Sequence, residues 1–175
     1  MKRTILQAIL MVMLLATAGV MAQDTAEPVL GVRGVDAASA SIMLEVHNEW
    51  RRDAGVPDLI WSETLAKTAQ AWADHLAKDG CLMEHSSDRM FGENLAWATA
   101  RRLSPDRVVN LWGHEKEHYD LEKNRCAENQ ICGHYTQMVW EDTREVGCGH
   151  AICGGAEVWV CHYYPQGNLP GETPY

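Results

Sequence analysis

Apolar residues recur at helical spacing between Ile42 and Asp53, and Gly55 follows directly. One stripe holds Met43, Val46, Trp50 and Ala54. This period predicts a helix that ends at the glycine. His47 lies on the same stripe, and we expect it to be a packed, hydrogen-bonded core residue.

Two further stretches have the same period. Ser62 can cap a helix that Gly80 ends, and its apolar positions are Leu65, Ala69, Trp72, Ala73 and Leu76. Ser104-Pro105 is a strong helix start, with a capping residue before proline at the first helical position. Val108, Leu111 and Trp112 then share a face with Glu115. A carboxylate on an apolar face must be paired, hydrogen-bonded or turned toward a wet cavity.

The remaining stretches predict a sheet and two shorter pieces. Glu145–Cys153 and Glu157–Tyr164 alternate as strands, and Gly154-Gly155 between them suits a hairpin turn. Gly133–Trp140 contains no proline after its first glycine and predicts a short helix that projects His134. Arg89–Trp97 is expected to form a short helical turn after a tight entry at Gly92. Helices on both sides of a sheet indicate the α/β class, a three-layer α-β-α sandwich with a central antiparallel sheet.

Residues 1–22 have the pattern of a secretory signal peptide. Lys2 and Arg3 precede an apolar run from Ile5 to Val20, and small or apolar residues follow at the cleavage position. A transmembrane anchor is the alternative, but the run is short and polar residues interrupt it. Residues 23–40 are small and polar and are expected to be a flexible lead-in. Residues 41–175 then form one domain with a single core.

Charge and cysteine content narrow the class of protein. The formal charge is −9, and removal of residues 1–22 leaves 13 basic against 24 acidic residues, or −11. Such a surface repels nucleic acid and anionic membranes, so neither is an expected partner. Six cysteines predict three disulfides in a secreted chain, outside the cell or in a periplasm, and spacing alone leaves fifteen pairings. A zinc site built from cysteines is disfavoured because no CxxC pair occurs.

Three segments carry a family resemblance: GENLAW at 92–97, GHYTQMVW at 133–140 and CHYYPQGN at 161–168. They resemble the CAP superfamily of cysteine-rich secretory, antigen 5 and group-one pathogenesis-related proteins, and most of all its plant group. The resemblance extends from Ile42 to Tyr175. It implies the three-layer fold, stabilised by the disulfides Cys81–Cys153, Cys126–Cys132 and Cys148–Cys161. The sequence departs from the family where His162 replaces a usual asparagine.

The resemblance also implies a cavity lined by His85, Glu93, Glu115 and His134. Such a tetrad can bind a divalent metal such as Zn²⁺ through His85 and His134, share protons as acid and base, or form a structural polar knot. We expect no catalytic residues. The alternative is a metal-dependent hydrolase or protease, and the HExxH pattern at 114–118 would suit one. We disfavour that pattern because no third ligand motif follows it and because Glu115 already belongs to the cavity.

Family members also bind sterols, fatty acids or other lipids, so we expect a monomeric, secreted binding module for a small hydrophobic ligand, with a role in defence or host interaction. An interhelical groove could be lined by Met43, Trp50, Val108 and Trp112, although such stripes are more often plain core. The segment Met138–Gly147, at the place of a sterol-binding loop, is highly charged. The end of the chain, PQGNLPGETPY at 165–175, resembles a peptide that plant members release as a signal. A turn-rich tail that packs on the domain is the other interpretation.

Overall fold

The computed structural model describes residues 34–99 and 102–175. The expected signal peptide and most of the expected lead-in therefore lie outside the described residues. Within the described part, no helix is both long and apolar enough to cross a membrane.

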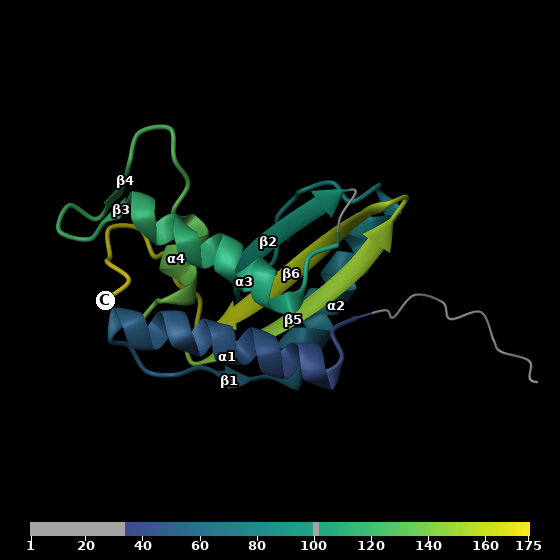
Figure 1. Cartoon of the computed structure of the whole chain (residues 1–175), viewed down its shortest axis with the longest axis horizontal. Helices are drawn as coiled ribbons and strands as arrows, with labels where there is room; N and C mark the ends of the chain where they lie inside the picture. Colours follow the sequence, from purple (N-terminus) through teal and green to yellow (C-terminus); the bar gives the residue numbers. More distant parts are fainter. Residues whose placement is uncertain (1–33, 100–101) are drawn as a thin grey trace, which may run out of the picture.

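Four α-helices, one 3₁₀ helix and six strands make up the described chain (Figure 1). In chain order they are α1 (Ala37–Ala54), β1 (Ile60–Trp61), α2 (Glu63–Lys78), β2 (Gly92–Thr99), α3 (Pro105–Gly113), η1 (His114–His118), β3 (Tyr119–Asp120), β4 (Arg125–Cys126), α4 (Gly133–Met138), β5 (Glu145–Cys153) and β6 (Ala156–Tyr164). The periodic helices and the β5–β6 hairpin are confirmed, but α3 ends at Gly113, before Glu115, and Leu111 is exposed on it and not part of the buried face. Gly154 and Gly155, both with positive φ, make the hairpin turn as expected.

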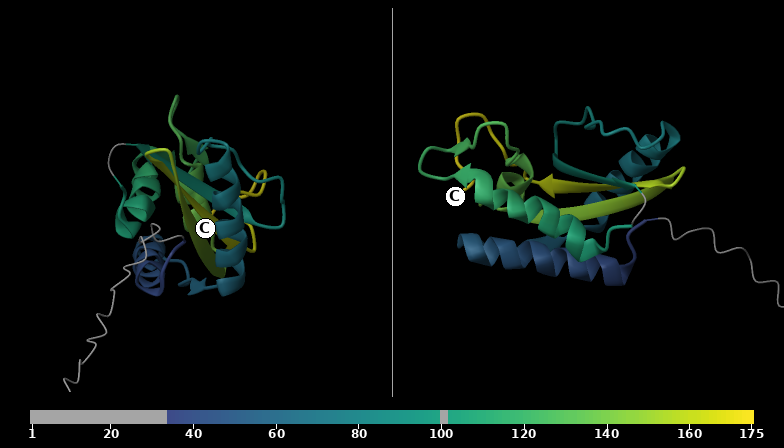
Figure 2. Two further views of the ribbon diagram at one scale, coloured as in Figure 1. Left: turned by 90° about the vertical axis from the view of Figure 1, so that its right-hand side faces the viewer. Right: turned by 45° about the horizontal axis from the view of Figure 1, so that its top comes forward.

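The main sheet has the order β1-β5-β6-β2, and it lies between two layers of helices (Figure 2). Its two faces bury separate clusters. Residues of α1, α3 and α4 pack with Val146, Trp159 and Tyr163 on one face, whereas α2 packs with Ala151 and Val158 on the other. The three-layer sandwich is confirmed.

The three long strands β5, β6 and β2 pair antiparallel, as expected, and the short edge strand β1 makes the sheet mixed. β1 pairs with β5 in parallel, through Ile60↔Glu145 and Trp61↔Val146. Two residues are too few to show an alternating pattern in the sequence.

Two local predictions were also wrong. GENLAW belongs to β2, an eight-residue strand that pairs with the whole of β6, and not to a helical turn. Its side chains alternate, because Leu95 packs with the α2 cluster while Ala96 packs with the opposite one. Residues 37–40 belong to α1, because the side chain of Asp36 accepts a hydrogen bond from Ser39 N (2.7 Å) and starts the helix there.

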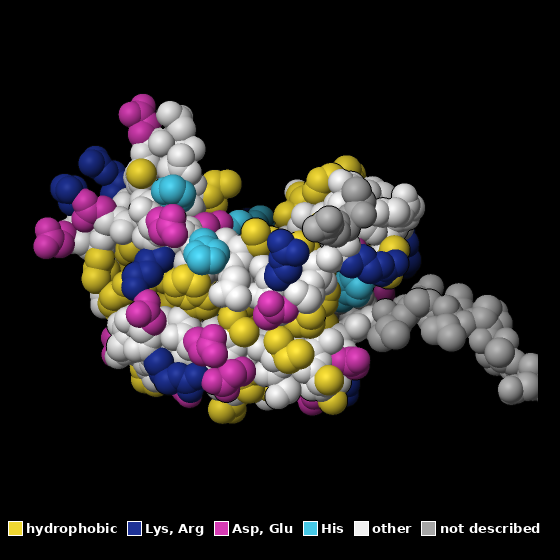
Figure 3. Space-filling model, viewed as in Figure 1, with side chains coloured by type: hydrophobic (Ala, Val, Ile, Leu, Met, Phe, Trp, Pro, Cys, Tyr) yellow, Lys and Arg dark blue, Asp and Glu magenta, His cyan; other side chains and the backbone are white. Residues whose placement is uncertain are grey.

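Three disulfides join the described parts, and they have the pairing that the family resemblance implied: Cys81–Cys153, Cys126–Cys132 and Cys148–Cys161. The first ties the segment after α2 to the end of β5. The second closes a short loop directly before α4. On the face seen in Figure 3, acidic and basic side chains are interspersed.

Candidate functional site

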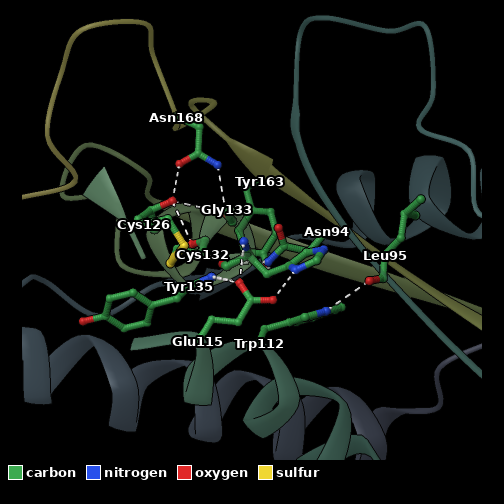
Figure 4. Close-up of polar contacts among 12 residues, drawn as sticks. Asn94, Leu95, Trp112, Glu115, Cys126, Cys132, Gly133, Tyr135, Tyr163 and Asn168 are labelled. Atoms are coloured by element: carbon green, nitrogen blue, oxygen red, sulfur yellow. Dashed lines mark hydrogen bonds and ion pairs between the residues drawn. A yellow bond between two sulfur atoms is a disulfide. The ribbon is translucent and has the colours of Figure 1, made fainter. Parts of the chain in front are cut away.

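Glu115 holds His134 by both its ring and its backbone. Glu115 lies in η1, and its Oε1 is 2.6 Å from His134 Nδ1. Its Oε2 accepts from the backbone N–H groups of His134 (3.0 Å) and Tyr135 (3.3 Å). These N–H groups start α4 and have no partner within the helix. One carboxylate therefore orients the imidazole and stabilises the helix that carries it (Figure 4).

Glu93 holds His85 in a similar way. The Nδ1 of His85 is 2.6 Å from Glu93 Oε1, which also accepts from the backbone N–H of Ser86 (3.0 Å). The side chain of Glu93 is only 7% exposed, whereas that of His85 is 61% exposed. The carboxylate is thus buried as an anchor and the imidazole reaches solvent.

A fifth residue, His162, completes the environment of Glu93. Its Nε2 is 3.0 Å from Glu93 Oε2, and its Nδ1 is 2.9 Å from the hydroxyl of Thr68. Its ring also stacks on Phe91, with centroids 5.3 Å apart. Sequence reasoning noted His162 only as a departure from the family, and missed this role. The contact arises because β2 and β6 pair Glu93 opposite His162.

The contacts around Glu93 shift two pKa values. Burial alone would raise the pKa of Glu93, but hydrogen bonds from His162, His85 and Ser86 outweigh it and lower the pKa to about 2. The hydrogen bond to Glu93 in turn raises the pKa of His85. Glu93 is therefore a fixed anion at neutral pH.

Both histidine–glutamate pairs lie at the end of the sheet where β2 begins. Asn94, next to Glu93, donates from Nδ2 to the carbonyl of His134 (3.1 Å). A Cβ on Gly92 would lie 2.0 Å from Gln137 Oε1 of α4, so the strand and the helix are in direct contact. A hollow of about 370 Å³ beside them is bounded by residues 85–93 and 166–170, with His85 in its wall. Figure 3 shows the molecule notched between two lobes at its upper edge.

Two imidazole nitrogens of the site are left without a hydrogen-bond partner in the described part of the protein. Among the described residues, the Nε2 atoms of His85 and His134 have no protein partner, whereas Glu93 and Glu115 use all four carboxylate oxygens. Histidines that ligate a metal through one ring nitrogen usually donate the N–H of the other to a carboxylate, which orients the ring. No three His, Cys, Asp or Glu side chains in the described ranges are grouped to ligate one ion. The described residues thus form two histidine–glutamate pairs, His85 with Glu93 and His134 with Glu115, each with one open imidazole nitrogen.

The HExxH pattern does not form a zinc-protease helix. Residues 114–118 form η1, whose turns close every three residues, so the two histidines are not aligned one α-turn apart. The side chain of His114 is 66% exposed and stacks edge-on to Trp50. Glu115 points instead to His134.

The candidate interhelical groove is part of the core, as its apolar stripes suggested. Met43 and Val108 are fully buried and Trp112 is 3% exposed. Trp112 donates from Nε1 to the carbonyl of Leu95, and it stacks against His134 with centroids 6.1 Å apart. Trp50, the fourth candidate, is partly buried and packs against this same core cluster.

The fold and the paired histidines and glutamates point to one class of protein. The family model described as "CAP: Cysteine-rich secretory protein family" matches residues 44–163. The chain therefore belongs to the CAP family.

Within that family, the chain is similar to pathogenesis-related protein 1C of Nicotiana tabacum. The two are 42% identical over 133 residues, which cover 75% of this chain and 78% of the relative. Among solved structures, it is similar to venom allergen-like protein 4 of Schistosoma mansoni, with 26% identity and a TM-score of 0.66 over 80% of this chain and 95% of the other. The structure of NaASP2 with Zn²⁺ has 22% identity and a TM-score of 0.64, over 81% of this chain and 86% of that one, and this likeness shows the fold alone.

Proposed function

We propose that this CAP protein is exported and acts by binding, and that His85 and His134 hold a divalent cation, Zn²⁺ in the first place. The observation that carries the proposal is the way in which the two nitrogens of each imidazole are used. Each has its Nδ1 held at 2.6 Å by a carboxylate, and each keeps Nε2 without a partner in the described chain. When bound, the ion would act as a Lewis acid toward a ligand in the adjacent hollow.

Glu93 and Glu115 have the wrong surroundings for a hydrolytic base. A general base needs an oxygen that can reach a water, but the four oxygens here accept from six nitrogen donors. We therefore propose binding rather than turnover. The kinship with pathogenesis-related proteins supports a role in defence or host interaction.

Titration of ZnCl₂ into chelator-treated protein tests the cation site, with heat as the readout. We expect saturable binding of one ion per chain at neutral pH. His85→Ala and His134→Ala each remove a ligand, and Glu93→Gln and Glu115→Gln should weaken binding roughly 10- to 100-fold by releasing the imidazoles.

The matched controls are His114→Ala and His118→Ala, because these histidines belong to η1 and the controls should bind zinc as the natural chain does. Binding that survives His134→Ala and disappears in His114→Ala would overturn the assignment. Chelator-sensitive turnover of a peptide that Glu115→Gln abolishes would favour the hydrolase instead.

A small hydrophobic ligand, a sterol or fatty acid, is the second proposal. It is supported by four large apolar side chains that are about half exposed or more on the segment before β2 and on β2 itself: Leu82, Met83, Met90 and Trp97. All four lie within residues 82–97, and exposed apolar side chains mark a binding surface where they form one patch.

Binding of a fluorescent sterol and of a fluorescent fatty acid tests this second proposal. Met83→Gln with Met90→Gln should weaken binding, and Ile131→Gln, a similarly exposed residue on the loop before α4, is the matched control. Equal binding by both variants, or no saturable binding by the natural chain, would contradict it.

A further inference from the structure

The C-terminal segment Pro165–Tyr175 lies against α4, the helix that carries His134 (Figure 1). Gly167 donates from its backbone N–H to the buried Gln137 side chain (3.0 Å). Further on, Glu141 N–H donates to the carbonyl of Pro174 (2.6 Å), and the hydroxyls of Tyr175 and Tyr135 are 3.1 Å apart. The segment is thus attached to α4, a helix of only six residues, and to the turn that follows it.

Asn168 makes the contact nearest to the site. Its Nδ2 donates to the carbonyl of Gly133 (2.9 Å), and its Oδ1 accepts from the hydroxyl of Thr136 (2.7 Å). Its backbone has φ +54°, a left-handed conformation that asparagine tolerates better than most residues. Figure 4 shows its side chain turned toward the start of α4.

The carbonyl of Gly133 and the N–H of His134 belong to one peptide group. Asn168 binds this group at its oxygen, and Glu115 binds it at its nitrogen (3.0 Å). A planar peptide held at both ends cannot rotate, so the direction in which the His134 side chain leaves the backbone is fixed. Because α4 is shorter than a helix that is stable by itself, these outside contacts decide its geometry.

We propose that Asn168 is a positioning residue for His134, and that the C-terminal segment is a built-in part of the cation site. This inference rests on the proposed function of His134 as a ligand. It has a regulatory consequence, because removal of residues 165–175 would release the peptide group before His134 and weaken the site. Release of a C-terminal peptide would then lower the affinity of the chain for the cation.

Asn168→Gly is the test, because glycine keeps the left-handed backbone while it removes both side-chain hydrogen bonds. We measure the affinity for Zn²⁺ by competition with a chelating dye, and the NMR signal of the His134 ring at Nδ1. We expect affinity to fall about tenfold, the low end for loss of an outer-shell contact. The ring signal should shift or broaden as its bond to Glu115 loosens.

Two other asparagines with positive φ give matched controls. Asn124→Gly removes two bonds, one from Nδ2 to the carbonyl of Glu172 (2.8 Å) and one from the hydroxyl of Tyr119 to Oδ1 (2.7 Å), and neither partner belongs to α4. Asn129→Gly has the same backbone conformation and, among the described residues, no side-chain hydrogen bond. Both should bind zinc with the affinity of the natural chain and keep the His134 signal.

Thr136 offers an independent variant if Asn168→Gly does not fold. Thr136→Val removes one of the two bonds and should weaken zinc binding, whereas Thr136→Ser keeps the hydroxyl and should restore it. The proposal is overturned if Asn168→Gly binds zinc with an affinity within twofold of that of the natural chain. If Asn168→Gly does not fold, the same result in Thr136→Val overturns it. If the natural chain binds no zinc, the proposed cation function fails, and an unchanged His134 ring signal in Asn168→Gly would then overturn the positioning role separately.

Discussion

At the scale of single residues, Arg51 is unusual because it is a fully buried cation bound by carbonyl groups. Its guanidinium donates to the carbonyls of Pro57 (2.6 Å), Met138 and Trp140 (both 2.8 Å) and Thr143 (3.0 Å). Burial lowers its pKa to about 10, so it stays charged at neutral pH. The planar fork of arginine thereby joins the loop after α1 to the end of α4 and to the turn before β5.

Replacement of Arg51 by Met should destabilise the fold by about 4 kcal/mol, because several buried carbonyls then lose their donors at about 1–3 kcal/mol each. Urea unfolding measures the change in the free energy of unfolding. Arg52→Met is the matched control, since Arg52 pairs with Glu45 and Asp58 at the surface and its loss should cost far less. Equal losses for the two variants would show that the carbonyl contacts of Arg51 are not important.

At the scale of elements, β5 and α2 approach so closely that only glycine fits between them. A Cβ on Gly149 would lie 2.4 Å from Gln70 N and Cα. Both atoms are backbone, so the strand and the helix would have to separate.

Gly149→Ala should therefore destabilise the protein by about 3 kcal/mol, the upper range for overpacking. Gly133→Ala is the matched control, because its nearest neighbour is a side-chain atom at 4.0 Å. Thermal unfolding of both variants by circular dichroism checks the difference. Similar melting temperatures would contradict the close approach.

Periodicity predicted the long helices and the β5–β6 hairpin, because each of them buries one regular face. It failed for β1, which has two residues, and for β2, where Asn94 and Glu93 interrupt the apolar alternation while they serve the site. Local pattern drew attention to Glu115, on an apolar face, and to His134, on a short helix, but the grouping of the four cavity residues followed from the family resemblance. The role of His162 depends on the register between β2 and β6, and this register cannot be predicted from the pattern of residues within either strand.

At the scale of the whole molecule, stability should depend on pH through buried histidines. His47 is fully buried between the carbonyl of Met43 (2.7 Å) and the hydroxyl of Tyr163 (2.8 Å). Burial lowers its pKa from 6.5 to about 4, and burial also lowers the pKa of His150. Between pH 6.5 and pH 4 the unfolded chain therefore binds protons that the folded chain does not, and stability falls as pH falls.

The His47 contribution amounts to about 3 kcal/mol at the acid end of this window, since one pKa unit is worth about 1.4 kcal/mol. Urea unfolding at pH 7 and at pH 4 measures the loss. His47→Gln should be less stable at pH 7. Its free energy of unfolding should also fall less between pH 7 and pH 4 than that of the natural chain, by most of the His47 contribution. The raised pKa of His85 acts in the opposite direction, but its side chain is 61% exposed and solvent screens it. A variant with the same loss as the natural chain would contradict the account.

The unequal exposure of the two imidazoles also has a kinetic consequence. His85 is 61% exposed and His134 only 24% exposed. An incoming ion would meet His85 first and would pass it last on departure. The residence time of the ion would then depend on how firmly Glu93 holds the His85 ring. Rapid mixing with a chelator measures the rate of release, and it should therefore distinguish variants whose equilibrium affinities are the same.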